Sequence, residues 1–521
     1  MKNRMNATSI RRSAVYGSIV SVASLVLSCS PAGKDSTVSP INGTAAAAAM
    51  TGTTGGASAS GGATYVGTGG SITLAGDIPQ EMPDGPCMGL ACNVAACTGS
   101  PTKTTISGKI YDPAGKIPLY NVVVYVPNAP VVPFTEGASC DRCGASIVNP
   151  VTSAITDETG SFVLQNAPSG ANVPLVIQVG KWRRQIMIPT VAPCVDTPLM
   201  DPQMMRLPRN KAEGDIPKIA ITVGAADQME CLPLRLGIDP AEFTTSAGDG
   251  RIHLYAGDHE MMTNRNPTPR LPVMQFDAMH GGAALTPASG FWTTTDSLMK
   301  YDIVILSCEG DSFPMQKPMN YRQAMYDYTT MGGRLFASHW HNVWFAQGPG
   351  LVPTVGTWRD LTPDPPNPSV ATINQSFPKG AALAKWLVNV QASMTLGQMN
   401  VEFPRDNLQA VNPDLAREWI TIDDPSKTPT KAVEYMSFNA PLGATDDKIC
   451  GRAVYTDLHV ASVDNNNTAN ALGFPASCEA PPPAAPHTFR DLSAQEKAVA
   501  FMLFDLSACV QNEDVAPKPP K

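Results

Sequence analysis

The sequence predicts a multidomain protein in which a disordered tether precedes a small antiparallel β-sandwich and an α/β domain with a parallel sheet. Residues 29–101 consist largely of Gly, Ala, Ser and Thr. Residues 102–206 carry short alternating strands between turn residues, whereas residues 218–510 alternate apolar strands with helices. The chain has 521 residues, which is more than one hydrophobic core ordinarily serves, so several folded units are expected.

The composition excludes some classes of protein. Charged residues make up 16% of the chain, and its 48 prolines and 42 glycines are typical of a loop-rich, extracytoplasmic protein. The formal net charge is −8 and the chain has no long basic run, so nucleic acid is not an expected partner.

Residues 1–28 have the pattern of a lipoprotein signal peptide. Basic residues precede the short apolar run "SAVYGSIVSVASLVLS". The run ends in "LVLSC", which resembles a bacterial lipobox and implies acylation of Cys29; the alternative is an ordinary signal peptide with a chance cysteine. Acyl chains on Cys29 would anchor the exported protein in a membrane. Because Ser30 is not an aspartate, the resemblance implies the outer membrane or the cell surface.

The cysteines of an exported chain predict disulfides. Twelve are present, and Cys29 leaves eleven, so one thiol is expected to stay free or to pair between chains. Cys87, Cys92 and Cys97 have no histidine nearby, which favours bridges to the first folded unit over a zinc site. The segment "CDRCG" (140–144) lies among turn residues, which favours a structural bridge over a redox motif. The connectivity stays open.

The segment 102–206 is predicted to be the β-sandwich. Its runs "TTISGKIYD", "LYNVVVYVPN" and "VPLVIQVGKWRRQIMIP" are rich in β-branched and aromatic residues and are separated by turn residues. The stretches "SGKIYDPAGKIPLYNVVVYV" and "TDETGSFVLQNAPSG" resemble the carboxypeptidase regulatory-like family. The resemblance implies a prealbumin-like (transthyretin-like) sandwich that serves as an accessory module without an active site of its own.

A polar linker (207–217) leads to the predicted α/β domain (218–510), and residues 511–521 are expected to be a disordered tail. Apolar strands are predicted at 218–224, 301–311, 334–338 and 450–460, and helices at 320–333 and 492–510. Ser493 and Glu496 form a capping box at the start of the last helix. Strands that alternate with helices predict a parallel sheet covered on both faces.

Polar side chains follow each of the four strands. Because parallel strands end at the same edge of a sheet, these side chains should converge if the strands are neighbours. They are Asp227, Cys308, Glu309, Ser338, His339, His341, Asp457 and His459.

The segments "YDIVILSCEGD", "GGRLFASH" and "RAVYTDLH" give residues 216–510 a resemblance to the class I glutamine amidotransferase-like fold, especially its ThuA-like branch. True amidotransferases carry a cysteine on a strained elbow after the third strand and a late His-x-Glu. Here His339 occupies the elbow, and Val460 and Ala461 follow His459, so the Cys-His-Glu triad is not present. Together the two domains resemble bacterial lipoproteins for which the family implies no established activity.

Three interpretations of the polar side chains stay open. In the first, the histidines and Asp457 form hydrogen bonds in an idle pocket. In the second, His339, His341 and His459 bind a metal such as zinc, completed by Asp457 or Glu309.

In the third interpretation, His339 or His459 is a general base, and Glu309 or Asp457 is the acid. Cys308 is a further candidate nucleophile, unless Cys231 forms a disulfide with it.

We therefore expect a surface or outer-membrane lipoprotein that acts as an extracytoplasmic binding or structural module. Its expected partners are the membrane and an envelope or extracellular polysaccharide or protein. The alternative is a metal-assisted hydrolase or carbohydrate-modifying enzyme that uses His339, His341 and His459.

Overall fold

The computed structural model of the chain describes residues 87–99, 101–143, 147, 149–258, 271–359, 363–460, 470–479 and 489–520. The predicted signal peptide, Cys29 and most of the predicted tether lie outside these residues. The end of the tether contains η1 (Gly89–Asn93) and the disulfide Cys87–Cys92. A second disulfide, Cys97–Cys194, ties this segment to the strands that follow. No helix in the described ranges is both long enough and apolar enough to cross a membrane.

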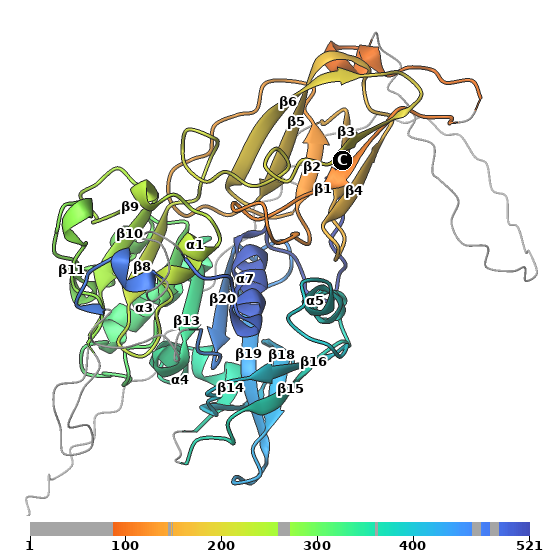
Figure 1. The fold of residues 1–521 in the computed structure, drawn as a ribbon. Helices are drawn as coiled ribbons and strands as arrows, with labels where there is room; N and C mark the ends of the chain where they lie inside the picture. Colours follow the sequence, from red (N-terminus) through yellow and green to blue (C-terminus); the bar gives the residue numbers. More distant parts are fainter. Residues whose placement is uncertain are drawn as a thin grey trace, which may run out of the picture. The chain divides into compact units, whose positions relative to one another are not determined.

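The first folded region consists of two sheets that share a hydrophobic core (Figure 1). The sheets have the strand orders β4-β1-β7 and β3-β2-β5-β6. Their strands are β1 (Thr105–Lys109), β2 (Val123–Val126), β3 (Thr152–Ile155), β4 (Ser161–Gln165), β5 (Gly170–Val179), β6 (Trp182–Val191) and β7 (Asp196–Leu199).

One strand pair corrects the expectation of a purely antiparallel sandwich. β7 runs parallel to β1, whereas the remaining pairs of the two sheets are antiparallel. The chain crosses from β6 in one sheet to β7 in the other. A crossing between sheets can bring a strand back parallel to its neighbour, which a tight hairpin within one sheet cannot do.

The larger sheet has eleven strands in the order β11-β10-β8-β12-β13-β20-β19-β18-β15-β16, with β9 beside β10. Its parallel half comprises β8 (Ile219–Val223), β9 (Phe243–Thr244), β10 (Ile252–Ala256), β11 (Thr286–Pro287), β12 (Ile303–Leu306), β13 (Arg334–Ser338) and β20 (Gly451–Thr456). Its antiparallel half comprises β15 (Ser369–Ile373), β16 (Gln398–Val401), β18 (Arg417–Asp423) and β19 (Lys431–Ala440).

The predicted parallel sheet is therefore correct for the half that contains the four predicted strands and wrong for the other half. The two longest antiparallel strands, β18 and β19, are joined by only a short turn. Parallel neighbours need a much longer crossover connection, so this turn requires antiparallel pairing. A separate two-stranded sheet pairs β14 (Gly356–Trp358) with β17 (Leu408–Val411).

Helices cover the larger sheet. The longer ones are α3 (Met319–Thr330), α5 (Pro378–Asn389) and α7 (Ala494–Ser507). The short ones are α1 (Cys231–Arg235), α2 (Thr295–Leu298) and α4 (Val343–Ala346). Single 3-10 turns are η2 (Pro240–Glu242), η3 (Ala278–His280), η4 (Ala288–Gly290), η5 (His339–Asn342), η6 (Val352–Val355) and η7 (Ala476–Cys478).

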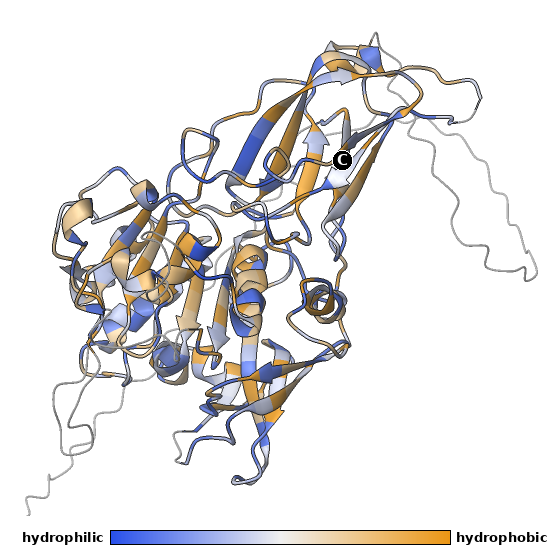
Figure 2. Cartoon of the chain, in the orientation of Figure 1, coloured by the Kyte–Doolittle hydropathy of each residue, from blue (hydrophilic) through white to orange (hydrophobic). Residues whose placement is uncertain are grey.

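Helix α7 starts with the predicted capping box, and it is buried on several faces rather than along a single stripe. The Ser493 side chain accepts from the Glu496 backbone N–H, and the Glu496 side chain accepts in return. Most of α7 is buried, and Figure 2 shows it mainly in hydrophobic colours. The reason is that neighbours surround it: Phe501 stacks on Tyr120 of the sandwich region, and Phe504 contacts Trp182, while the sheet lies on another side.

Two disulfides and several ion pairs join the sandwich region to the α/β region. Cys140 pairs with Cys450, and Cys143 pairs with Cys509. The two cysteines of "CDRCG" are structural, as expected, but each bridges to a distant partner. Lys181 at the β5–β6 turn lies 2.6 Å from an oxygen of Asp302.

The chain end also departs from the predicted disordered tail. Within the described residues 511–520, Asp514 pairs with Arg417 at 2.6 Å, and Glu513 accepts a hydrogen bond from Ser437. Buried Glu513 also pairs with the buried Arg452. The tail is ordered because these charged side chains find partners on β18, β19 and β20. The local sequence of the tail does not show that these partners lie nearby.

Candidate functional site

The candidate site lies at the carboxyl edge of the parallel half-sheet. Strands β8, β12, β13 and β20 are consecutive neighbours in the sheet, so the segments that follow them come together. The structure brings Cys308, His339 and His459 into one group whose ligand atoms lie within 4.8 Å of one another. We call these three residues the Cys-His-His cluster.

His339 is the central member of the cluster. It follows β13 directly and has a φ of 42°, in the left-handed region that non-glycine residues rarely adopt. Its Nε2 lies 3.0 Å from Oδ1 of Asn407, so Nε2 carries the proton and donates it. The lone pair of Nδ1 therefore faces the other two cluster members. Burial lowers the pKa of His339 to about 3, which keeps the ring neutral.

Cys308 supplies a thiol to the cluster. Its Sγ lies 3.3 Å from Nδ1 of His339. It is the one free cysteine among the described residues, so the expected single unpaired thiol is found. The alternative of a Cys231–Cys308 bridge is wrong, because Cys231 pairs with Cys478. Burial raises the pKa of the Cys308 thiol to about 12, so by itself it is a poor nucleophile.

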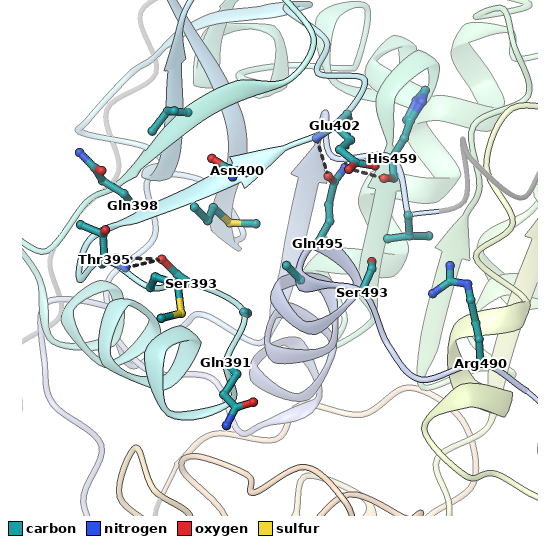
Figure 3. A pocket seen from close by; sticks show the side chains of 16 residues that line it. Gln391, Ser393, Thr395, Gln398, Asn400, Glu402, His459, Arg490, Ser493 and Gln495 are labelled. Atoms are coloured by element: carbon teal, nitrogen blue, oxygen red, sulfur yellow. Dashed lines mark hydrogen bonds between the residues drawn. The ribbon is translucent and has the colours of Figure 1, made fainter.

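His459 completes the cluster and connects it to a cavity. Its Nε2 lies 3.1 Å from Nδ1 of His339. Its backbone carbonyl accepts a hydrogen bond from the Gln495 amide at the start of α7. Residue His459 also lies in the wall of a cavity of about 690 Å³, and in Figure 3 its ring points away from the other lining side chains. Among the cluster members, His459 is the one that lines this cavity.

His341 lies outside the cluster, although the sequence grouped it with His339 and His459. Its Nδ1 accepts from the indole N–H of Trp344 at 2.9 Å, and its Nε2 donates to the Ser307 carbonyl at 2.9 Å. Both ring nitrogens are thus used. Burial holds the pKa of His341 well below its usual value, so the ring is a neutral structural group.

The two candidate acids also lie apart from the cluster. Glu309 pairs with Nζ of Lys317 at 2.7 Å and accepts from the Asp258 backbone N–H. Burial raises the pKa of Glu309 to about 7, although Lys317 opposes the shift. Asp457 accepts from the Tyr455 hydroxyl at 2.6 Å, and burial raises its pKa to about 7. In the described part of the chain, no carboxylate joins the cluster.

Asp227 holds the loops around the cluster together. One of its oxygens accepts from the Ser338 hydroxyl at 2.9 Å, and the other accepts from the Val460 backbone N–H at 3.0 Å. These contacts link the segments after β8, β13 and β20. The predicted convergence therefore includes Asp227 and Ser338 as positioning residues beside the cluster.

The cavity next to His459 is formed by residues that sequence analysis missed. They come from β16, the segment after α5 and the start of α7, and Figure 3 shows them around one hollow. The polar ones are Gln391, Ser393, Thr395, Gln398, Asn400, Glu402, Arg490, Ser493 and Gln495. Asn407, the partner of His339, was missed as well. Their segments are far apart along the chain and carry no motif that marks them.

Comparison with protein-family models gives no match, and comparison with curated proteins gives none. Three of the similar solved structures are weak matches. A ThuA-like protein from Bacteroides uniformis is 14% identical over 39% of this chain and 81% of its own, with a TM-score of 0.22. A cytoplasmic protein from Salmonella typhimurium is 14% identical over 36% and 78%, with a TM-score of 0.22. A cohesin–X-dockerin complex from Acetivibrio cellulolyticus is 17% identical over 28% and 79%, with a TM-score of 0.14.

Proposed function

We propose that the protein is a lipid-anchored extracytoplasmic binding module whose ligand is a neutral, polyhydroxylated polymer such as an envelope or extracellular polysaccharide. The observation that carries this proposal is the cavity of about 690 Å³ beside His459, in what we take to be a ThuA-like domain. Its volume lies within the range of about 300–1,000 Å³ that is usual for small-ligand sites.

The chemistry of the cavity lining favours a neutral ligand rich in hydroxyl groups. Amide and hydroxyl side chains both donate and accept hydrogen bonds, as sugar hydroxyls do. Among the polar lining residues only Glu402 and Arg490 are charged, and their charges are opposite. A strongly anionic or cationic ligand would leave its charge without a matching partner in such a site.

The location of the protein is part of the same proposal. The "LVLSC" sequence supports lipidation of Cys29 and attachment to the outer membrane or the cell surface. The disulfides among the described residues support an oxidising compartment outside the cytoplasm.

Binding of neutral polysaccharides by the full chain, purified in detergent, tests the function. Gln398 and Asn400 are exposed residues of β16 that line the cavity. For a polysaccharide identified on a glycan array, we expect the Gln398→Ala, Asn400→Ala double variant to raise the Kd at least about tenfold, since two hydrogen bonds are lost. Titration calorimetry measures this change.

The control is Gln185→Ala, which removes an exposed amide from β6 of the sandwich region, outside the cavity lining. It should bind as the wild type does. A wild-type chain that binds no glycan, or a double variant with unchanged Kd, would contradict the proposal.

A metal-assisted hydrolase is the second candidate function. The observation that favours it is that His459 belongs both to the Cys-His-His cluster and to the wall of the cavity. The same glycans separate the two functions. New reducing ends that appear with the wild type and disappear with a chelator indicate a hydrolase, whereas binding without cleavage indicates the binding module.

A further inference from the structure

The Cys-His-His cluster combines three donor atoms that transition metals bind. Sγ of Cys308 and Nε2 of His459 lie 3.3 and 3.1 Å from Nδ1 of His339. The three residues follow β12, β13 and β20, which are adjacent strands. Each is at most 4% exposed, so the three donors are buried at the edge of the sheet.

The spacing of these atoms is close to that around a tetrahedral zinc ion. Zn–N bonds of about 2.0–2.1 Å and a Zn–S bond of about 2.3 Å place two nitrogens about 3.4 Å apart and a nitrogen and a sulfur about 3.6 Å apart. The observed distances are shorter by about 0.3 Å in each case. Small side-chain rotations would therefore accommodate the ion.

Hydrogen bonding alone accounts poorly for the cluster. Because Nε2 of His339 donates to Asn407, its Nδ1 has a single lone pair. That lone pair faces both the thiol and the His459 nitrogen, and it cannot accept fully from two donors. A cation removes this conflict, because it accepts electron density from all three atoms at once.

Asn407 has the role of an outer partner in a metal site. Histidine ligands of metals nearly always donate their second ring N–H to an oxygen, which fixes the tautomer and the ring orientation. The contact of 3.0 Å between Nε2 of His339 and Oδ1 of Asn407 has this geometry. His341, whose two nitrogens are already used, lacks a free lone pair and is excluded as a ligand.

We propose that Cys308, His339 and His459 bind one zinc ion. Two imidazoles and one thiolate suit zinc among the common divalent ions of the cell envelope, whereas calcium and magnesium require oxygen ligands. Three protein ligands leave a fourth position open, as in catalytic zinc sites. His459 is the ligand that lines the cavity. Zinc binding is independent of the proposed glycan binding, and the metal content of the purified protein tests it.

Metal analysis of the full chain, purified in detergent without chelator, is the direct test. We expect about one equivalent of zinc in the wild type and in His280→Ala, which removes a partly exposed histidine outside the cluster. Cys308→Ala and His459→Ala should each lose at least about 90% of the zinc, because removing a first ligand weakens binding more than the 10–100-fold of an outer partner.

Cobalt substitution of the wild type keeps the test decisive if a variant fails to fold. Cobalt bound through Cys308 should give a thiolate-to-cobalt charge-transfer band in the near ultraviolet and visible bands of tetrahedral geometry. Absence of both zinc and this band would overturn the proposal. One equivalent of copper without zinc would overturn the choice of metal, and zinc retained by both variants would overturn the choice of ligands.

Discussion

At the scale of single residues, buried polar groups set the properties of this protein. The neutral states of Cys308, His339 and His341 all follow from burial, which opposes charge on each side chain. A metal ion would reverse this effect for Cys308, since a metal-bound thiol is deprotonated. The protonation state of Cys308 would therefore differ between the metal-free cluster and a cluster that holds the proposed ion.

Glu230, just before α1, predicts a pH dependence of stability. It is fully buried, and neither carboxylate oxygen has a hydrogen-bond partner among the described residues. Burial raises its pKa to about 8, and Asp227 adds to the shift. The folded state therefore keeps this proton up to about pH 8, whereas the unfolded chain loses it near pH 4.5. The buried carboxyl group therefore destabilises the folded state above about pH 4.5. The resulting loss in the free energy of unfolding grows by up to about 1.4 kcal/mol per pH unit until about pH 8.

Glu230→Gln removes that contribution while keeping the shape of the side chain. We expect its Tm to exceed that of the wild type at pH 8.5 by several degrees, and the difference to shrink toward pH 5. Calorimetry at both values measures the change. An equal difference at the two pH values would show that the pKa of Glu230 does not cause it.

At the scale of elements, the connections between strands determine whether neighbouring strands are parallel or antiparallel. The neighbours of a helix determine which of its faces are buried. The β18–β19 turn requires antiparallel pairing of these two strands. Helix α7 has a clear capping box and a buried stripe, both visible in the sequence. Its remaining faces are buried by contacts with the sandwich region.

The β5–β6 turn shows how close that contact is. Gly180 has a φ of 54°, and a Cβ built there would lie 1.8 Å from the carbonyl oxygen of Ser507, at the end of α7. Gly180→Ala should lower the free energy of unfolding by about 2–5 kcal/mol, because strain and a backbone clash add. Gly350→Ala is the matched control: its φ is 56° with nothing within 4 Å, so it should cost only about 1–2 kcal/mol. If denaturant titrations gave the two variants equal losses in the free energy of unfolding, the close approach of Gly180 to Ser507 would be contradicted.

At the scale of the whole molecule, covalent bridges unite segments that lie far apart along the chain. The bridge from Cys140 to Cys450 spans 310 residues, and that from Cys143 to Cys509 spans 366. Each connects the loop after β2 to the α/β region. A crosslink of this length removes much of the freedom of the unfolded chain, so its effect on stability is large.

Replacing one long bridge tests that effect. Cys140→Ser with Cys450→Ser should lower the free energy of unfolding by about 2–5 kcal/mol. The control, Cys87→Ser with Cys92→Ser, opens a bridge that spans five residues and holds η1, which has no buried residue, so a loss below about 1 kcal/mol is expected. Thermal unfolding of both variants measures the difference, and equal losses would argue against the long bridge as a major constraint.

The local features of this protein can be predicted from its amino-acid sequence alone. Apolar runs marked β8, β12, β13 and β20, a capping box marked α7, and an odd cysteine count indicated one free thiol. These features depend on neighbours along the chain, whose chemistry is visible in any short window. The same patterns indicated that His339 and His459 would lie at one edge of the sheet.

The contacts between distant side chains, by contrast, become visible only in the folded chain. It placed Cys308, rather than His341, against His339 and His459, because ring direction depends on packing with Trp344 and Ser307. It also paired the cysteines, ordered the chain end and formed the cavity from segments that are distant along the chain. Such contacts depend on the strand order and on the distances that folding creates, and no local pattern encodes them.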